Sequence, residues 1–196
     1  MPPTRRIGVF GGTFDPPHIG HLITAIDVRC ALDLDVMLMV VANEPWQKAS
    51  RDVTPAATRL AMVRAAVEGE PGVEASDVEI RRGGPSYTVD TLIELREREP
   101  EAELFLLLGS DAAAGLDTWQ RVEELPALCT IVVVERPGSN TPLPDGFTVQ
   151  HVTVPRLEVS STELRERAAM GRSLRHLVPD GVISLIREGD LYGDRR

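Results

Sequence analysis

The chain has few cysteines and no long apolar segment, and both absences narrow its class. Its two cysteines, Cys30 and Cys129, lie in apolar surroundings without metal-ligand spacing, so we expect buried, reduced thiols. No apolar run approaches the length that crosses a bilayer. The amino terminus, MPPTRRIGVFGG, turns glycine-rich before the apolar core of a signal peptide could form. We therefore expect a cytoplasmic protein without a membrane partner.

An excess of basic residues is also lacking, because 21 Lys and Arg stand against 30 Asp and Glu, for a net charge of −9. A protein that binds duplexes needs a basic patch to neutralise phosphates, so nucleic acid is not an expected partner. If the ligand is a small anion, a few local cations must act against this acidic background. Lys48, Arg136 and Arg165 are the candidates. The 196 residues suit one well-cored domain, on which we expect a carboxyl-terminal helical segment, about 160–196, to pack.

Short apolar runs alternate with helical patterns along the chain. We predict strands at 7–10, 36–42, 104–108 and 131–134, and weaker edge strands at 73–80 and 147–154. The four strong runs are continuous in apolar residues, which is typical of parallel strands covered on both faces. Helices are predicted at 21–32, 55–68, 89–98, 119–125, 162–170 and 181–187, and a surface loop at 137–146. This order predicts a doubly wound α/β fold, an open parallel sheet with helices on both faces.

A glycine-rich turn with two histidines, GGTFDPPHIGH, follows the first strand. Paired glycines let backbone N–H groups approach a phosphate, and the start of the next helix adds unpaired donors and a positive dipole end. His18 and His21 are three residues apart, so both rings can face one ligand, and Gly20 leaves room between them. A structural turn with incidental histidines is the alternative, but two of the chain's four histidines fall here. The stretch is neither GxGxxG nor a GK(S/T) phosphate loop.

A second motif, VSSTELR, precedes a late predicted helix. Ser160 and Glu163 have the spacing of a capping box, and a well-capped helix is the simplest interpretation. Arg165, however, places a cation in the early turns, where it opposes the helix dipole unless an anion lies nearby. A bound phosphate would supply that anion.

Two further motifs follow predicted strands or open predicted helices. Gly109, Ser110 and Asp111 follow the third strong strand, where the carboxylate suits a ribose hydroxyl, a metal-bound water or a helix cap. Trp119 offers a surface for ring stacking, although aromatic side chains more often pack in the core. The stretch PSYTVDTL opens a helix, with Ser86 and Thr88 as candidate caps.

Together these motifs resemble the HxGH nucleotidyltransferase superfamily, in particular the bacterial nicotinate mononucleotide adenylyltransferases. The resemblance rests on GGTFDPPHIGH, SYTVDTL, GSD, RPG and VSSTELR, which occur in the family's order across nearly the whole chain. It implies a Rossmann-like fold and direct adenylyl transfer, in which ATP and nicotinate mononucleotide give deamido-NAD and pyrophosphate. It also implies Mg²⁺ with ATP as the cofactor. Because hard octahedral ions prefer phosphate oxygens and water, we expect no dedicated protein cage for this ion.

The resemblance also assigns residues to roles. The phosphates and the transition state fall to His18, His21 and Arg165. ATP binding falls to Gly11, Gly12, Thr13, Phe14, Gly20, Gly109, Asp111, Arg136, Ser160, Ser161 and Thr162, and binding of the mononucleotide to Lys48, Ser86, Tyr87, Thr88 and Trp119. Thr88 would meet the pyridine carboxylate, and Trp119 would stack on the pyridine ring.

The sequence departs from the family at two places. Where relatives carry Pro-Pro-His-Lys after the second strand, this chain has Asn43, Glu44, Pro45, Trp46, Gln47 and Lys48, and small residues fill 112–115. The alternatives are a related adenylyltransferase that uses nicotinamide mononucleotide or phosphopantetheine, and a nucleotide-binding module without catalysis. The sequence leaves a homo-oligomer open.

Overall fold

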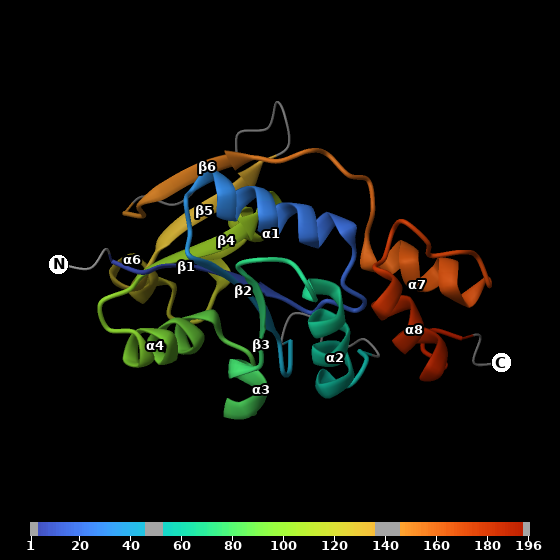
Figure 1. Cartoon of the computed structure of the whole chain (residues 1–196). Helices are drawn as coiled ribbons and strands as arrows, with labels where there is room; N and C mark the ends of the chain where they lie inside the picture. Colours follow the sequence, from blue (N-terminus) through green and yellow to red (C-terminus); the bar gives the residue numbers. More distant parts are fainter. Residues whose placement is uncertain (1–3, 46–52, 136–145, 194–196) are drawn as a thin grey trace.

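The computed structural model of the chain describes residues 4–45, 53–135 and 146–193. Within these residues a single parallel sheet has the strand order β3-β2-β1-β4-β5-β6 (Figure 1). This is the strand order of the doubly wound Rossmann fold, so the predicted fold class is confirmed. The strands are β1 (Arg6–Gly12), β2 (Val36–Val41), β3 (Val73–Ser76), β4 (Glu103–Gly109), β5 (Thr130–Glu135) and β6 (Val149–Thr153).

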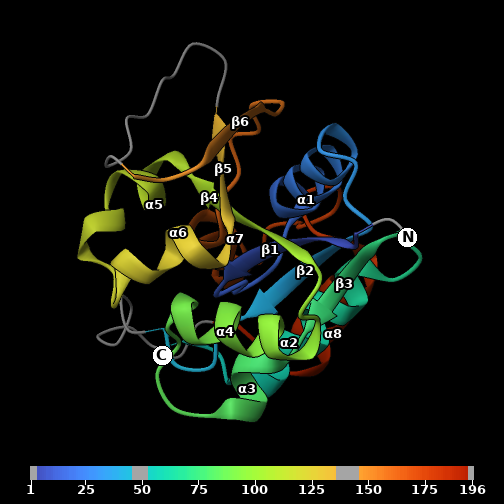
Figure 2. The same cartoon turned by 90° about the vertical axis from the view of Figure 1, so that its left-hand side faces the viewer.

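Helices cover both faces of the sheet, which explains why the strand sequences are apolar throughout. On one face, α1 (Ile19–Ala31) and α2 (Ala56–Val67) pack over Met37, Met39 and Phe105. On the other, α3 (Val78–Arg82), α4 (Thr88–Arg98), α5 (Ser110–Ala114) and α6 (Leu125–Leu128) pack over Leu104 and Leu106. Figure 2 shows α1 on one side of the strands and α5 and α6 on the other.

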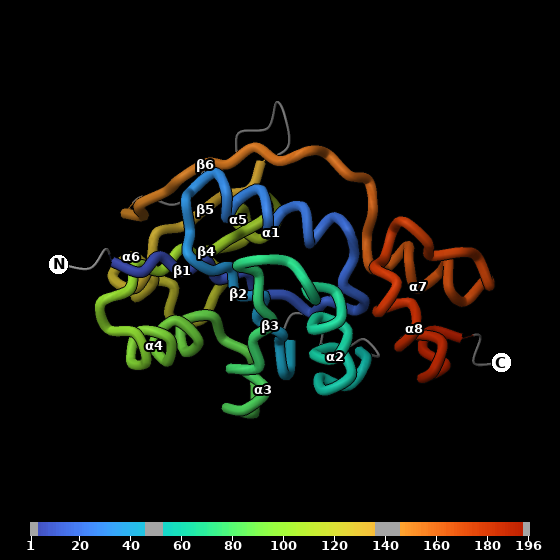
Figure 3. Tube along the Cα trace, viewed as in Figure 1, coloured from blue at the N-terminus to red at the C-terminus, as the bar shows by residue number. Residues whose placement is uncertain are grey.

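Two late helices form a third apolar cluster beside the sheet. They are α7 (Ser161–Ala169) and α8 (Asp180–Glu188), close to their predicted bounds. Val182 and Ile186 of α8 and Leu164 of α7 bury their side chains against Met62 and Ala66 of α2, and Figure 3 shows α8 beside α2. The motif that starts α7 is therefore fixed to the same helix layer that covers β1 and β2.

Two predicted elements are wrong. The strand predicted at 73–80 ends at Ser76, and Val78 instead starts α3 and turns its side chain into the core. The helix predicted at 119–125 is absent. Trp119 has an extended backbone (φ −78°, ψ 147°), and the left-handed conformation of Arg121 (φ 54°) separates it from the short turns that follow, η3 (Val122–Glu124) and α6.

The two cysteines differ in environment. Cys129 is buried as predicted, and burial raises the pKa of its thiol to about 12. Cys30 is exposed, so its predicted burial is wrong. It follows the buried Val28 by two residues in α1, a spacing that turns it away from the buried side of the helix. No helix in the described segments has the length and apolar character needed to span a membrane.

The chain reverses its direction of travel across the sheet between β1 and β4. From β1 it proceeds through β2 to β3, returns to β4 on the other side of β1, and continues through β5 to β6. In doubly wound sheets, ligands bind at this switch point, beyond the carboxyl ends of the strands. Gly11 and Gly12 end β1, and Gly109 ends β4.

Candidate active site

Two adjoining cavities open at the switch point. The larger, of about 800 Å³, lies between the glycine-rich turn, the start of α5 and the start of α7. The smaller, of about 210 Å³, lies between the ends of β1 and β4, the start of α4 and the segment around Trp119. Five residues line both of them, namely Phe10, Gly12, Thr13, Gly109 and Ala112. Two ligands bound in these cavities would therefore meet over the ends of β1 and β4.

Some of the predicted site residues line the larger cavity and others line the smaller one. The larger is lined by Gly12, Thr13, Phe14, His18, Gly20, His21, Gly109, Asp111, Ser160, Ser161, Thr162 and Arg165. The smaller is lined by Gly11, Ser86, Tyr87, Thr88 and Trp119, together with the shared residues. Gly11 differs from its expected place, since it borders only the smaller cavity. Lys48, Arg136 and Trp46 lie outside the described residues.

The two histidines stack at the start of α1. His18 is the residue before the helix, and its backbone N–H donates to Nδ1 of His21 at 3.2 Å. Their ring centroids are 3.7 Å apart, and the Phe14 and His21 rings form a T-shaped pair with centroids 5.0 Å apart. A Cβ on Gly20 would lie 3.1 Å from both the His18 ring and Val159. A side chain at position 20 would therefore press on the His18 ring and on Val159, which precedes α7.

Burial changes the chemistry of His18. Only 6% of its surface is exposed, and desolvation lowers its pKa from 6.5 to about 4. The ring is therefore neutral at pH 7 without a ligand. One of the helix-start donors expected here is also already used, because the N–H of Ile19 donates to the carbonyl of Leu177 at 3.0 Å.

The start of α7 is attached to the glycine-rich turn. Ser160 caps the helix as predicted, accepting from the backbone N–H of Glu163 at 3.2 Å. Ser161 Oγ donates to the carbonyl of Pro16 at 2.9 Å. Arg165 donates through Nη1 to the carbonyl of Asp15 at 2.8 Å, and through Nη2 to Thr162 Oγ1 at 3.2 Å. Arg165 thus lines the larger cavity in an orientation fixed by two oxygen atoms.

Asp15 and Tyr192 support the turn in a way that the sequence interpretation missed. The Asp15 carboxyl group is 4% exposed and accepts from the Tyr192 hydroxyl at 2.5 Å and from the backbone N–H of Thr54 at 3.1 Å. Burial and the neighbouring Asp15 carboxyl group raise the pKa of Tyr192, which keeps its proton. The only sequence signal was the position of Asp15 inside GGTFDPPHIGH.

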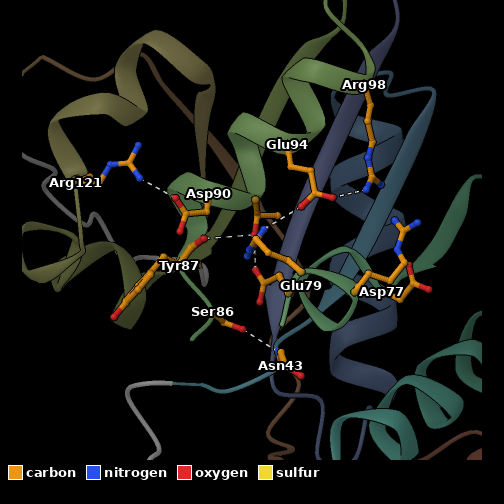
Figure 4. A network of polar contacts seen from close by, with 12 residues as sticks. Asn43, Asp77, Glu79, Ser86, Tyr87, Asp90, Glu94, Arg98 and Arg121 are labelled. Carbon is orange, nitrogen blue, oxygen red and sulfur yellow. Dashed lines mark hydrogen bonds and ion pairs between the residues drawn. The ribbon is translucent and has the colours of Figure 1, made fainter. Parts of the chain in front are cut away.

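The wall of the smaller cavity is held by side-chain to backbone hydrogen bonds (Figure 4). The prediction that Ser86 caps α4 is wrong. The Ser86 Oγ accepts from the backbone N–H of Asn43 at 2.8 Å, and the backbone N–H of Ser86 donates to Glu44 at 3.1 Å. Nor does Thr88 act as a cap, since it is the first residue of α4 and Tyr87 precedes the helix without a side-chain cap.

The opposite wall of this cavity is attached to α4 by an ion pair. Arg121 Nη1 lies 2.7 Å from Asp90 Oδ1 in the first turn of α4 (Figure 4). The half-buried Trp119 lies two residues earlier and packs against the core. A missed carboxylate, Glu79, is 7% exposed, lines this cavity and accepts from Thr91 Oγ1 at 2.7 Å.

The arrangement of these residues defines the class of protein. The parallel sheet has the strand order of nucleotide-binding folds. Two histidines and an arginine line the larger cavity, and an aromatic ring and several hydroxyl groups line the smaller one. This combination is suited to group transfer between two ligands that bind side by side.

Comparison with known proteins gives the family. The model of the cytidylyltransferase-like family matches residues 9–167. A probable nicotinate-nucleotide adenylyltransferase of Corynebacterium kroppenstedtii is 47% identical over 95% of this chain and 90% of its own. One from Exiguobacterium sibiricum is 47% identical over 95% of this chain and 98% of its own. The chain belongs to the cytidylyltransferase-like family, within the nicotinate-nucleotide adenylyltransferase group.

Solved structures agree on the fold. A nicotinic acid mononucleotide adenylyltransferase of Plasmodium falciparum superimposes with a TM-score of 0.79 over 96% of this chain and 97% of its own, at 18% identity.

Proposed function

We propose that the protein is an adenylyltransferase that joins ATP to nicotinate mononucleotide, giving deamido-NAD and pyrophosphate in NAD biosynthesis. The observation that carries this proposal is the pair of cavities that share their lining at the ends of β1 and β4. Relatives at 47% identity carry the name of this activity, and the Plasmodium protein of the same fold was solved in complex with NaAD. The larger cavity is assigned to ATP, and the smaller to the pyridine mononucleotide.

The reaction is a direct displacement. An oxygen of the mononucleotide 5′-phosphate attacks the α-phosphorus of ATP, the bond from that phosphorus to the bridging oxygen breaks, and pyrophosphate leaves with the bond electrons. The attacking phosphate is already anionic near neutral pH, so no enzyme nucleophile is required. Positioning and charge stabilisation suffice. Loss of one positioned donor in such a site typically costs about 10²–10³-fold in rate.

His18, His21 and Arg165 are assigned to the triphosphate because they line the same cavity. Arg165 brings a positive charge, whereas His18 is neutral until an anion arrives. A bound triphosphate places negative charge beside His18 and favours its protonated form, which raises its pKa. Lys48 and Arg136 stay assigned to the phosphates and the nucleotide through the family resemblance.

Mg²⁺ fits this site as a companion of ATP. The described residues contain no group of three His, Cys, Asp or Glu side chains that could hold a metal ion. Three carboxyl groups line the larger cavity. Asp15 is already bonded to Tyr192 and Thr54, Glu135 lies 3.0 Å from His151, and Asp111 is exposed. Triphosphate oxygens and water would therefore provide most ligands, with Asp111 the protein group to complete the set. The ion would neutralise charge on the departing pyrophosphate.

The test is pyrophosphate release with ATP, Mg²⁺ and a panel of acceptors. We expect the highest kcat/KM with nicotinate mononucleotide. Faster turnover with nicotinamide mononucleotide or phosphopantetheine would move the protein to a related specificity, and no turnover with any acceptor would favour a binding module. The matched pair His21→Ala and His176→Asn tests the histidines, since His176 is exposed and outside both cavities. Asn tolerates the left-handed backbone (φ 64°) at that position.

A further inference from the structure

A buried arginine lies beside the two cavities without lining either of them. Arg59 of α2 is 1% exposed and is absent from the walls of both. Desolvation lowers its pKa, and the Asp15 carboxylate, Tyr192 and Glu79 oppose that shift. Asp15 lines the larger cavity and Glu79 lines the smaller. The charge of Arg59 is thus balanced by one carboxyl group from each substrate cavity.

The Arg59 guanidinium connects three separate segments. Its Nε donates to the carbonyl of Thr54 at 2.7 Å, its Nη1 to that of Thr13 at 2.9 Å, and its Nη2 to that of Asn43 at 3.1 Å. Thr13 belongs to the glycine-rich turn and lines both cavities. A planar fork of donors reaches such divergent acceptors at once, which the single ammonium of lysine cannot do.

Asn43 extends this connection to the wall of the smaller cavity. Its backbone N–H donates to Ser86 Oγ at 2.8 Å (Figure 4). Its side-chain Nδ2 donates to the carbonyl of Gly84 at 2.9 Å. Ser86 lines the smaller cavity. An uninterrupted path of hydrogen bonds therefore runs from Thr13 through Arg59 and Asn43 to Ser86.

We infer that Arg59 is a positioning residue that couples the two substrate sites, so that filling the ATP cavity orders the mononucleotide cavity and the reverse. This inference rests on the proposed function, because it takes ATP and nicotinate mononucleotide as the two ligands. A ligand that fixes Thr13 also fixes the guanidinium, which then holds Asn43 and the Gly84–Ser86 segment in the arrangement that accepts the second ligand. Coupling between sites is reciprocal, so each ligand raises affinity for the other by the same factor.

Calorimetric titration tests the coupling directly. The affinity for nicotinate mononucleotide is measured with and without a saturating non-hydrolysable ATP analogue, in the parent protein, in Arg59→Lys and in the control Arg64→Lys. Arg64 lies on the same helix, is 61% exposed and pairs only loosely with Asp77, at 3.6 Å. In the parent and the control we expect the analogue to raise affinity by about fivefold or more. In Arg59→Lys the factor falls toward one, and catalytic turnover shows a raised KM for the mononucleotide that ATP no longer lowers.

A second variant keeps the inference testable if Arg59→Lys unfolds. Asn43→Ala removes only the half-exposed side chain that bonds to Gly84, so the fold should persist. It leaves the backbone bonds of Asn43 to Arg59 and Ser86 in place, so it should lose only the part of the coupling factor that the Asn43–Gly84 bond transmits. Adding it to Arg59→Lys should cause no further loss, since Arg59 holds Asn43 and acts ahead of that bond.

Three results would overturn the inference. These are an unchanged factor in folded Arg59→Lys, additive losses in the double variant, and binding of both ligands to the parent protein without coupling. If the parent binds neither ligand, the proposed function itself fails, which is a different outcome.

Discussion

The buried His18 ring makes the stability of the protein depend on pH in a calculable way. Its folded-state pKa is about 4, against 6.5 for an exposed histidine. Between pH 4 and pH 6.5, His18 is mostly protonated in the unfolded chain and mostly neutral in the folded protein. The contribution of His18 to the free energy of unfolding is therefore present above pH 6.5 and is lost as pH falls toward 4. Its upper limit is about 3 kcal/mol, since each pKa unit corresponds to about 1.4 kcal/mol.

The measurable part lies between pH 7 and pH 5, above the range where most carboxylates titrate. Linkage with these two pKa values gives a loss of about 2 kcal/mol over that interval from His18 alone. Urea unfolding at pH 7, 6 and 5 measures it as the difference between the parent and His18→Gln, which removes the titrating group and retains a polar side chain. The parent should lose about 2 kcal/mol more than the variant. Equal losses in both proteins would show that burial of His18 does not disfavour its charge.

The same residue should respond to an anion. A histidine NMR titration of the free protein should place His18 near pH 4, and saturating pyrophosphate should move its midpoint upward, because negative charge nearby favours the protonated ring. A midpoint that stays in place while pyrophosphate binds would separate His18 from the phosphate site.

Three substitutions test other parts of the site. Gly20→Ala puts a methyl group 3.1 Å from the His18 ring and Val159; steady-state kinetics should give a kcat about tenfold lower, since small misplacements are costly in such sites. Trp119→Ala should raise KM for the mononucleotide about tenfold through lost stacking, and an equal rise in KM for ATP would contradict the assignment of the cavities. Tyr192→Phe removes the hydroxyl that bonds to Asp15 at 2.5 Å and should lower the free energy of unfolding by about 2 kcal/mol in urea titrations; unchanged stability would argue against that contact.

The parallel sheet could be predicted because its strands are buried on both faces. In β4, Leu104, Leu106 and Leu108 pack on one side, and Phe105 and Leu107 on the other, which produces an uninterrupted apolar run. It could also be predicted that the sequence motifs lie close together in the fold. Each of them follows a strand or opens a helix, and the carboxyl ends of parallel strands share one edge of the sheet.

The supports of the site could not be read from the sequence. Arg59 lies on the buried side of α2 with Met62, Val63 and Ala66, but nothing local shows that three carbonyls accept from its guanidinium. The Asp15–Tyr192 contact joins residues 177 positions apart. Trp119 does not start a helix because the left-handed backbone of Arg121 interrupts the chain there; the Arg121 side chain pairs with Glu124 in the same turn and with Asp90 of α4. The contacts of Arg59 and Asp15 are tertiary and leave no periodic signal in the sequence.

The turn that carries His18 also suggests how a chain with a net charge of −9 can accept a triphosphate. Three carbonyl oxygens of the turn accept hydrogen bonds from side chains: that of Thr13 from Arg59, that of Asp15 from Arg165, and that of Pro16 from Ser161. Carbonyl oxygens are the negative ends of peptide dipoles and would repel phosphate if they faced it. Bonded donors, two of them cationic, offset that repulsion. Anion binding here depends on fixing the negative ends of the backbone as much as on adding cations, so loss of a support such as Arg59 should weaken ligand affinity as well as stability.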